Sequence, residues 1–297
     1  MRAILSAVFL SALPALGGAS PKIWEEFSGE KARQHMQHLV DLGPRPAASE
    51  AIEKSRAYIE KELASYGWKL SRQMFSDETP RGKITFVNLI AQFEGKEKRT
   101  SPPSFLLLSH YDTKTFDTFA FVGANDGGSS TGLLLEMARV LALRPELAAK
   151  IQLVFFDGEE AYESFTATDG LYGSRYFAKQ LVENKTAGQF RGGVLFDMVG
   201  DRLLNITLSP NSPPQITEQI FAAATALKLR EYFTYFQGDI TDDHTPLNGI
   251  GIPTIDLIDF DFPAWHTADD KIDKVSAESL QRVGAVAAYY LSELAFK

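Results

Sequence analysis

The sequence predicts an α/β fold: a three-layer sandwich in which a mixed, mostly parallel central sheet carries helices on both faces. Two observations lead to this prediction. Apolar runs alternate with helical patterns along the chain, an order typical of parallel strands joined by helices. The apolar runs are also continuous instead of alternating with polar residues, which indicates strands covered on both faces. No repeat or linker divides residues 20–297, so we expect one domain there.

The elements follow in order. Two helical patterns precede the strands and are separated by the turn-like segment 43–46; strands and helices then alternate. The apolar run at 84–93 has an alternative, an antiparallel edge hairpin with the segment before it. We expect strands at 84–93, 105–110, 151–157, 193–198 and 253–259, and helices at 31–42, 49–67, 129–143, 171–182, 214–229 and 277–295.

Residues 1–19 form a separate unit. Arg2 is followed by an almost wholly apolar stretch over residues 3–16 and then by small residues, the layout of a secretory signal peptide. The stretch is short for a membrane span, which needs about 20 residues; an uncleaved anchor is the alternative. We therefore expect an exported protein, periplasmic or extracellular, with no stable membrane span.

Composition excludes several classes of protein. The formal charge is 30 − 38 = −8 and no basic run is present, so we expect no nucleic-acid partner. Hydrophobic residues make up 44% of the chain, too many for a disordered one. The absence of cysteine excludes disulfides, thiolate metal sites and cysteine nucleophiles. A transition-metal site must therefore use His, Asp and Glu.

Polar side chains gather where the predicted strands end. Ligands of open α/β sheets bind at the carboxyl ends of the strands, so the candidate chemistry lies along one edge of the sheet. Four apolar runs end in acids or histidine: LLLSHYD, LVFFDGEE, VLFDMVGD and IDLIDFDF.

Each strand-end residue also has a plain structural interpretation. A lone histidine at a strand end, such as His110, is more often a structural residue that forms a hydrogen bond than a metal ligand. Asp126 is equally well placed to cap the helix that follows it. The acids of Asp157-Gly158-Glu159-Glu160 suit a solvated loop. In the functional interpretation, one glutamate binds a metal while its neighbour, which points the other way, handles a proton.

Histidines narrow the choice of metal site. Of the five in the chain, His110, His244 and His266 fall in strand-end loops. His35 and His38, one helical turn apart, are interpreted as surface or packing residues. One histidine, two carboxylates and an open position suit catalytic zinc. Part of the acidic excess is then one negatively charged pocket around a cation, made of Asp126, Asp157, Glu159, Glu160, Asp197 and Asp242.

From about Lys31 to the C-terminus, the chain resembles the glutaminyl-peptide cyclotransferases, which share the fold of the zinc exopeptidases. The ordered motifs that carry the resemblance are HYDTK, GANDGG, DGEEA, TDGLYGSRYFA, LFDMVGD, DDHTPLNGIGIP and FPAWHTADD. The resemblance implies one catalytic domain that converts the N-terminal glutamine of peptides or proteins to pyroglutamate and releases ammonia. We expect it to act as a monomer.

The resemblance also implies roles for individual residues. One zinc ion per chain is expected, with Asp126, Glu160 and His266 as ligands. Glu159 matches the general acid/base of the family. Asp197 and Asp242 match two acids that share hydrogen bonds with this group. Trp265 and Phe165 match two aromatic residues of the substrate pocket, and animal members have tryptophan at the position of Phe165. Lys114 of HYDTK also matches the cyclase pattern.

The main alternative is an aminopeptidase with two zinc ions. There, His110, Asp126 and Asp197 would hold one metal, and Asp126, Glu160 and His266 the other. Aminopeptidases usually have Ser-Asp-His where this chain has Asp242-Asp243-His244, and Tyr or Phe where it has Trp265. Segment 168–174 also favours the cyclases. A non-catalytic binding protein, the third hypothesis, predicts a broken ligand set, whereas this one is complete.

Overall fold

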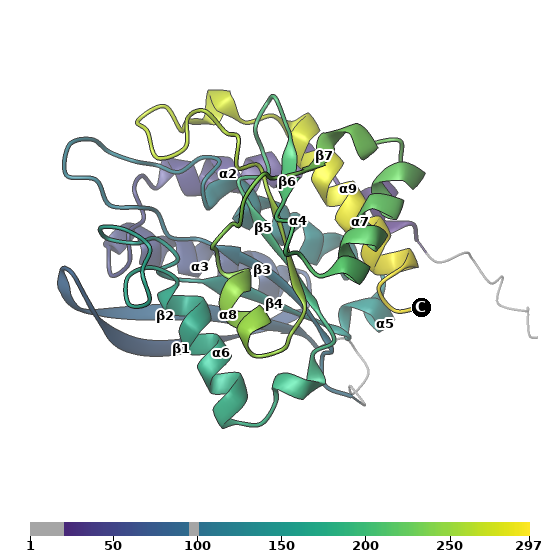
Figure 1. Ribbon diagram of the computed structural model, residues 1–297, viewed down its shortest axis with the longest axis horizontal. Coiled ribbons are helices and arrows are strands. Elements are labelled where there is room, and N and C mark those ends of the chain that lie inside the picture. The colour runs from purple at the N-terminus through teal and green to yellow at the C-terminus, as the bar shows by residue number, and fades with distance from the viewer. Residues whose placement is uncertain (1–20, 95–100) are drawn as a thin grey trace, which may run out of the picture.

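Figure 1 shows a computed structural model that describes residues 21–94 and 101–297. The expected signal peptide, residues 1–19, lies outside the described residues. One mixed sheet runs through the molecule in the order β1-β2-β4-β3-β5-β8-β6-β7. Its strands are β1 (Trp68–Thr79), β2 (Gly82–Phe93), β3 (Phe105–His110), β4 (Ile151–Phe156), β5 (Gly193–Asp197), β6 (Ile206–Leu208), β7 (Phe233–Tyr235) and β8 (Thr254–Ile258).

The centre of the sheet is parallel. Strand β3 pairs in parallel with β4 and β5, and β5 pairs in parallel with β8. Antiparallel pairs flank this centre on both sides: β2 with β4, and β6 with β8. Strands β1 and β2 form the antiparallel edge hairpin that the sequence offered as an alternative. The mostly parallel sheet expected from the sequence is confirmed.

Helices cover both faces of the sheet (Figure 1). Helices α2, α4 and α9 pack together on one face, joined by α1, α3 and α7, whereas α6 and α8 contact each other and strands β2 and β8. The helices are α1 (Ile23–Glu26), α2 (Gly29–Asp41), α3 (Glu50–Ser65), α4 (Gly128–Leu141), α5 (Pro145–Ala148), α6 (Tyr172–Glu183), α7 (Pro214–Ala226), α8 (His244–Gly249) and α9 (Ala277–Glu293).

Two hydrophobic cores explain why the strands read as continuous apolar runs. On β3, Leu107 belongs to the larger core, which includes Leu134 of α4. Its neighbours Leu106 and Leu108 belong to the second core with Phe177 of α6. Successive side chains of a strand point to opposite faces, so a strand between two helical layers buries every residue. This arrangement fixes the central strands, whose carboxyl ends form the site.

Local signals set the starts of the long helices. Ser28, Ser49 and Ser276 cap α2, α3 and α9, each accepting a hydrogen bond from the backbone N–H three residues later. Such caps satisfy N–H groups that have no partner within the helix. Within residues 21–94 and 101–297, no helix combines the length and apolar character that a membrane crossing requires.

Candidate active site

A pocket opens at the carboxyl ends of the parallel strands. His110 and Asp197 are the last residues of β3 and β5, and the loops after β3, β4, β7 and β8 supply the other groups. The space in and above the hollow, open solvent included, is about 320 Å³. Its lining includes almost all the site residues expected from the sequence: Asp126, Glu159, Glu160, Asp197, Asp242, His266, Phe165 and Trp265.

Three side chains converge on one point of the pocket. The Nε2 atom of His266 lies 3.3 Å from Oδ2 of Asp126 and 3.3 Å from Oε2 of Glu160. Ligand atoms of all three residues lie within 4.8 Å of one another. Both carboxylate oxygens are buried and have no hydrogen-bond partner among the described residues. Buried carboxylates without donors are expensive unless a cation is present, so this donor set fits a metal ion, and its composition suits zinc.

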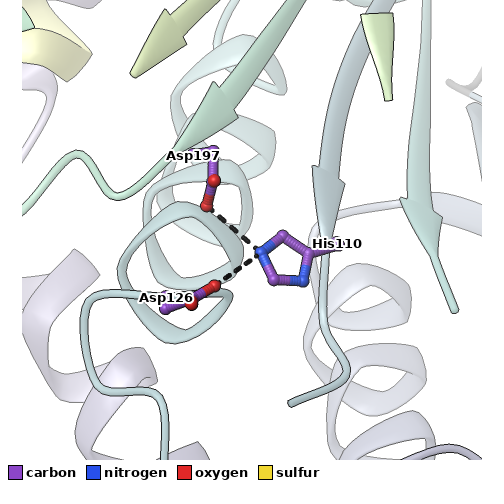
Figure 2. Close-up of side chains that lie close together, drawn as sticks. All are labelled: His110, Asp126 and Asp197. Atoms are coloured by element: carbon purple, nitrogen blue, oxygen red, sulfur yellow. Dashed lines mark hydrogen bonds and ion pairs between the residues drawn. The ribbon is translucent and has the colours of Figure 1, made fainter. Parts of the chain in front are cut away.

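Figure 2 shows a second group of possible ligands, His110, Asp126 and Asp197, which shares Asp126 with the first group. Nε2 of His110 lies 3.1 Å from Oδ1 of Asp197 and 3.2 Å from Oδ1 of Asp126. Nε2 of His110 and Oδ1 of Asp197 form a hydrogen bond with each other. The Asp197 carboxylate therefore has a partner without a metal ion, whereas Oδ2 of Asp126 and Oε2 of Glu160 have no hydrogen-bond partner among the described residues, and neither has Nδ1 of His110. This difference between the two groups favours one metal site, at Asp126, Glu160 and His266.

Asp126 does not cap the helix that follows it. Helix α4 begins after Gly127 and has no side-chain cap, because the Asp126 carboxylate faces the two histidines instead. The backbone of the ligand loop is fixed from outside: Oδ1 of Asp270 accepts a hydrogen bond from the Asn125 N–H at 2.7 Å, and Oδ2 accepts one from the Asp126 N–H at 3.0 Å.

The adjacent glutamates point to different partners. Glu160 faces His266, whereas Oε2 of Glu159 lies 4.0 Å from Nδ1 of His110. Both backbone N–H groups donate to the carboxylate of Asp112, at 3.2 and 3.4 Å. Each glutamate is only 6% exposed. The solvated-loop interpretation is therefore wrong, and the two side chains are arranged for separate tasks.

Burial gives Glu159 the character of a proton-transfer group. Its desolvation, together with the nearby carboxylates of Glu160 and Asp242, raises the pKa of Glu159 well above its ordinary value, although His110 opposes the shift. A carboxyl group whose pKa is raised in this way holds a proton more readily than a free glutamate, which suits a group that accepts and returns a proton.

A further buried acid lies behind the pocket lining, next to Asp242. Asp256 of β8 is buried beside Asp242, and burial with neighbouring Asp242 and Asp197 raises its pKa well above the ordinary range. Nδ1 of His244 lies 3.6 Å from Oδ2 of Asp256. Burial lowers the pKa of His244 to about 4, so this imidazole is neutral at physiological pH.

Aromatic side chains form the wall of the pocket. The Trp265 ring stacks on His266 with a centroid distance of 4.3 Å and packs against Phe260 at 5.2 Å. Phe165 and Trp265 are each 38% exposed, which places both at the mouth. His266 has a left-handed backbone with φ of 54°, a strained conformation typical of functional sites.

Three other residues singled out in the sequence lie at the edge of the site or away from it. Asp157 was wrongly placed in the acidic pocket: its Oδ2 atom pairs with Nη2 of Arg56 at 2.6 Å. The Lys114 N–H donates to Oε1 of Glu160 at 3.1 Å. His35 is a packing residue, as expected, because its Nδ1 lies 2.6 Å from the Tyr58 hydroxyl.

His38, one turn from His35 on α2, is a surface residue: it is exposed, and its ring stacks on Tyr58 at 3.8 Å. The sequence analysis missed the supports of the ligand loops, Asp112, Asp270 and Arg45. The fully buried Arg45 guanidinium donates to Val122 O at 2.8 Å and to Gly123 O at 3.3 Å. Asp112 and Asp270 lie within the motifs HYDTK and WHTADD. Their position in these motifs was the only feature of the sequence that could have pointed to them.

We expect metal binding to release a proton from His266. Burial alone would lower the pKa of His266, but the Asp126 and Glu160 carboxylates outweigh it and raise this pKa to about 10 in the metal-free protein. The imidazole is therefore protonated at neutral pH, and a metal ion must displace the proton. Below the raised pKa, metal affinity should fall about tenfold per unit decrease in pH.

Calorimetric zinc titrations in buffers of different ionisation enthalpy measure this release directly. About one proton per ion is expected at neutral pH. Affinity that does not change with pH would contradict the assignment of His266 as a ligand.

Comparison with known proteins places the chain among relatives. Residues 88–291 match the family model described as Peptidase family M28. Glutaminyl-peptide cyclotransferase of Drosophila melanogaster is 31% identical, with 86% of this chain and 80% of the relative covered. The solved structure of an Acidobacteriales bacterium glutaminyl cyclase is 32% identical, with a TM-score of 0.79 and coverage of 95% of this chain and 98% of the other.

A leucine aminopeptidase precursor from Bacteroides thetaiotaomicron is also similar in structure. It is 26% identical, with a TM-score of 0.79, and the match covers 90% of this chain and 97% of the other. The fold is therefore shared by proteins with both names, whereas the higher identities are with the cyclases. The chain belongs to peptidase family M28 and, within it, to the glutaminyl-peptide cyclotransferases.

Proposed function

We propose that this protein is a glutaminyl-peptide cyclotransferase that acts on peptides and proteins with an N-terminal glutamine. The α-amine attacks the side-chain amide carbon of the same residue, a lactam C–N bond forms, and the bond to the amide nitrogen breaks to release ammonia. One observation carries the proposal: the buried Glu159, with its raised pKa, lies beside the trio of Asp126, Glu160 and His266 without belonging to it.

We infer that zinc is the metal and that Asp126, Glu160 and His266 hold it. The support is the donor set itself: one imidazole and two carboxylates, each of which has one buried oxygen, Oδ2 of Asp126 and Oε2 of Glu160, without a hydrogen-bond partner among the described residues. When bound, zinc supplies a Lewis acid that polarises the substrate amide carbonyl.

Glu159 would move the proton. It accepts one proton from the attacking α-amine and delivers it to the departing nitrogen, so its own charge is restored after each turnover. Both reacting groups belong to one substrate residue, so the pocket must fold that side chain back on itself. Trp265 and Phe165 would provide the walls that enforce this conformation.

Asp197 and Asp242 would tune Glu159. Burial raises the pKa of both carboxyl groups, although His110 opposes the shift at Asp197. Clustered buried carboxylates cannot all ionise together. The negative charges of Asp197 and Asp242 would therefore raise the proton affinity of Glu159, which helps it to take up a proton and return it.

A two-metal aminopeptidase is the second candidate function. The observation in its favour is the adjacent group of His110, Asp126 and Asp197, which offers ligand atoms for a second metal ion. The hydrogen bond between His110 and Asp197 weighs against it.

The deciding experiment compares two peptides that differ only in the first residue. We expect a glutamine-initiated peptide to lose one ammonia, detected by mass spectrometry, and a leucine-initiated peptide to remain intact. An N-acetylated glutamine peptide is the matched control, because it lacks the attacking amine and should not react. Release of leucine from the second peptide would favour the aminopeptidase.

We also infer that the protein is exported and works as a monomer in the periplasm or outside the cell. The support for export is the apolar stretch after Arg2 together with the absence of cysteine. N-terminal sequencing of the secreted protein would test it, and a retained Met1 would contradict cleavage.

A further inference from the structure

The loop between β4 and α6 carries one wall of the pocket. It runs from Glu160 to Leu171, and Phe165 at its centre lines the hollow. Residues 163–168, which include Phe165, are all exposed, so hydrophobic burial contributes little to the conformation of this central stretch. Asp169 follows this exposed stretch directly and is only 5% exposed.

The Asp169 carboxylate accepts hydrogen bonds from the backbone of the first half of the loop. Its Oδ1 atom accepts hydrogen bonds from the Tyr162 N–H at 2.8 Å and the Tyr172 hydroxyl at 2.9 Å. Its Oδ2 atom accepts them from the Glu163 N–H at 2.9 Å and the Ser164 N–H at 3.2 Å. Consecutive N–H groups that converge on one carboxylate form an anion nest, here filled by a residue of the same loop.

The second half of the loop closes on the same residue. The Thr166 N–H donates to the backbone carbonyl of Asp169 at 3.0 Å, and the Asp169 N–H donates to the Thr166 hydroxyl at 3.0 Å. Phe165 therefore lies between two stretches of backbone that are both tied to Asp169.

The Phe165 ring packs closely against the backbone of Gly170. Gly170 has φ of 89°, and a β-carbon added there would lie 2.6 Å from Cδ1 of Phe165. The same β-carbon would lie 3.3 Å from Cβ of Ala161. The ring can therefore rest against the backbone only while the loop keeps this path.

We propose that Asp169 is a positioning residue for substrate binding, which acts by holding Phe165 at the mouth of the pocket. The proposal rests on the proposed cyclase function, for which Phe165 is a wall of the substrate pocket. Asp169 contacts none of the three proposed metal ligands through its side chain, so its loss should weaken binding and leave the chemical step and the metal site unchanged.

The first test is the kinetics of Asp169→Asn. The amide keeps the size of the side chain but cannot accept four hydrogen bonds from N–H and O–H donors. We expect KM for the glutamine peptide to rise about tenfold, with kcat changed less than about threefold and zinc affinity unchanged. A fall in kcat with KM unchanged would overturn the proposal.

The second test asks whether Asp169 acts through Phe165. Phe165→Ala removes an exposed ring, so the variant should fold, and it should raise KM by a similar factor. In the Phe165→Ala background, Asp169→Asn should add less than about a twofold effect, because coupled residues are not additive. If the increase in KM of the double variant equals the product of the two single increases, Asp169 does not act through Phe165 and the proposal is overturned.

Hydrogen exchange provides a readout that does not depend on activity. In Asp169→Asn, the amides of residues 162–164 should exchange faster, whereas those of Asn125 and Asp126 should not change. Asp201→Asn is the matched control: Asp201 holds a turn outside the pocket lining by accepting from the Leu203 N–H at 3.2 Å, so its substitution should leave KM and exchange at 162–164 unchanged.

These outcomes separate the two proposals. Unchanged exchange at residues 162–164 overturns the role of Asp169 even if the wild-type protein is a cyclase. A wild-type protein that does not cyclise glutamine peptides overturns the cyclase function instead. In that case, KM of the wild-type protein and of Asp169→Asn is compared with the leucine-initiated peptide. A KM that does not rise in Asp169→Asn again overturns the role of Asp169.

Discussion

Glu159→Gln is expected to reduce cyclisation about a thousandfold or more while the protein still binds one zinc ion. General acid–base groups typically contribute about 100- to 10,000-fold to a rate, and here one group both accepts and returns the proton. The amide keeps the shape of the side chain but cannot take up a proton. Zinc should remain because Glu159 is outside the trio that converges on His266.

Stability separates this loss of activity from misfolding. The pKa of Glu159 is raised by burial, so above the pKa of the unfolded chain, near 4.3, the folded state holds a proton that the unfolded state has lost. The Glu159 carboxyl therefore reduces stability at neutral pH, and glutamine removes that cost. The Tm of the metal-free variant should be no lower than that of the wild-type protein.

Three measurements check this prediction: kcat from ammonia release, bound zinc from elemental analysis, and Tm. Glu183→Gln is the matched control, because Glu183 lies exposed at the end of α6, where it pairs with Lys179. It should keep wild-type kcat. Turnover by Glu159→Gln within about threefold of wild type would exclude Glu159 as the proton-transfer group.

The central strands could be predicted because burial on both faces leaves a continuous apolar run. The expected strand at 105–110 coincides with β3, and the others differ by a few residues at their ends. Strands β6 and β7 have three residues each, too short for any periodicity. Strand β1 is largely exposed and depends on pairing with β2, which a local pattern does not reveal.

The convergence of the site residues could be predicted for a topological reason. Parallel neighbours end on the same side of a sheet, so His110 and Asp197 meet although 87 positions separate them in the chain. The direction of each side chain could not be predicted. Asp157 follows the same kind of strand but turns to Arg56, 101 residues away, because that pairing depends on how α3 packs.

The supports of the loops show a second limit of sequence reasoning. Asp112 and Asp270 act by accepting hydrogen bonds from backbone N–H groups of the ligand loops. Every residue except proline carries such a group, so its position gives no signal in the sequence. Their role follows only from the folded path of the chain.

His266→Ala should abolish both metal binding and cyclisation. The substitution removes one of three ligand atoms and leaves the buried carboxylates of Asp126 and Glu160 facing each other without the imidazole. Changes to residues that merely support a ligand already cost about 10- to 100-fold in metal affinity, so loss of a ligand should cost more. Activity should follow zinc occupancy and recover in part when excess zinc is added.

His110→Asn is the variant that makes this result decisive. Its carboxamide can still donate to Asp197, as the imidazole does at 3.1 Å, which limits the structural damage. With one metal site, His110→Asn should retain about one zinc ion per chain, while His266→Ala retains almost none. With two sites, the wild-type protein should hold two zinc ions and His110→Asn should lose one of them. Elemental analysis of the three proteins therefore distinguishes the site of a cyclase from that of a two-metal aminopeptidase, independently of the substrate used in the assay.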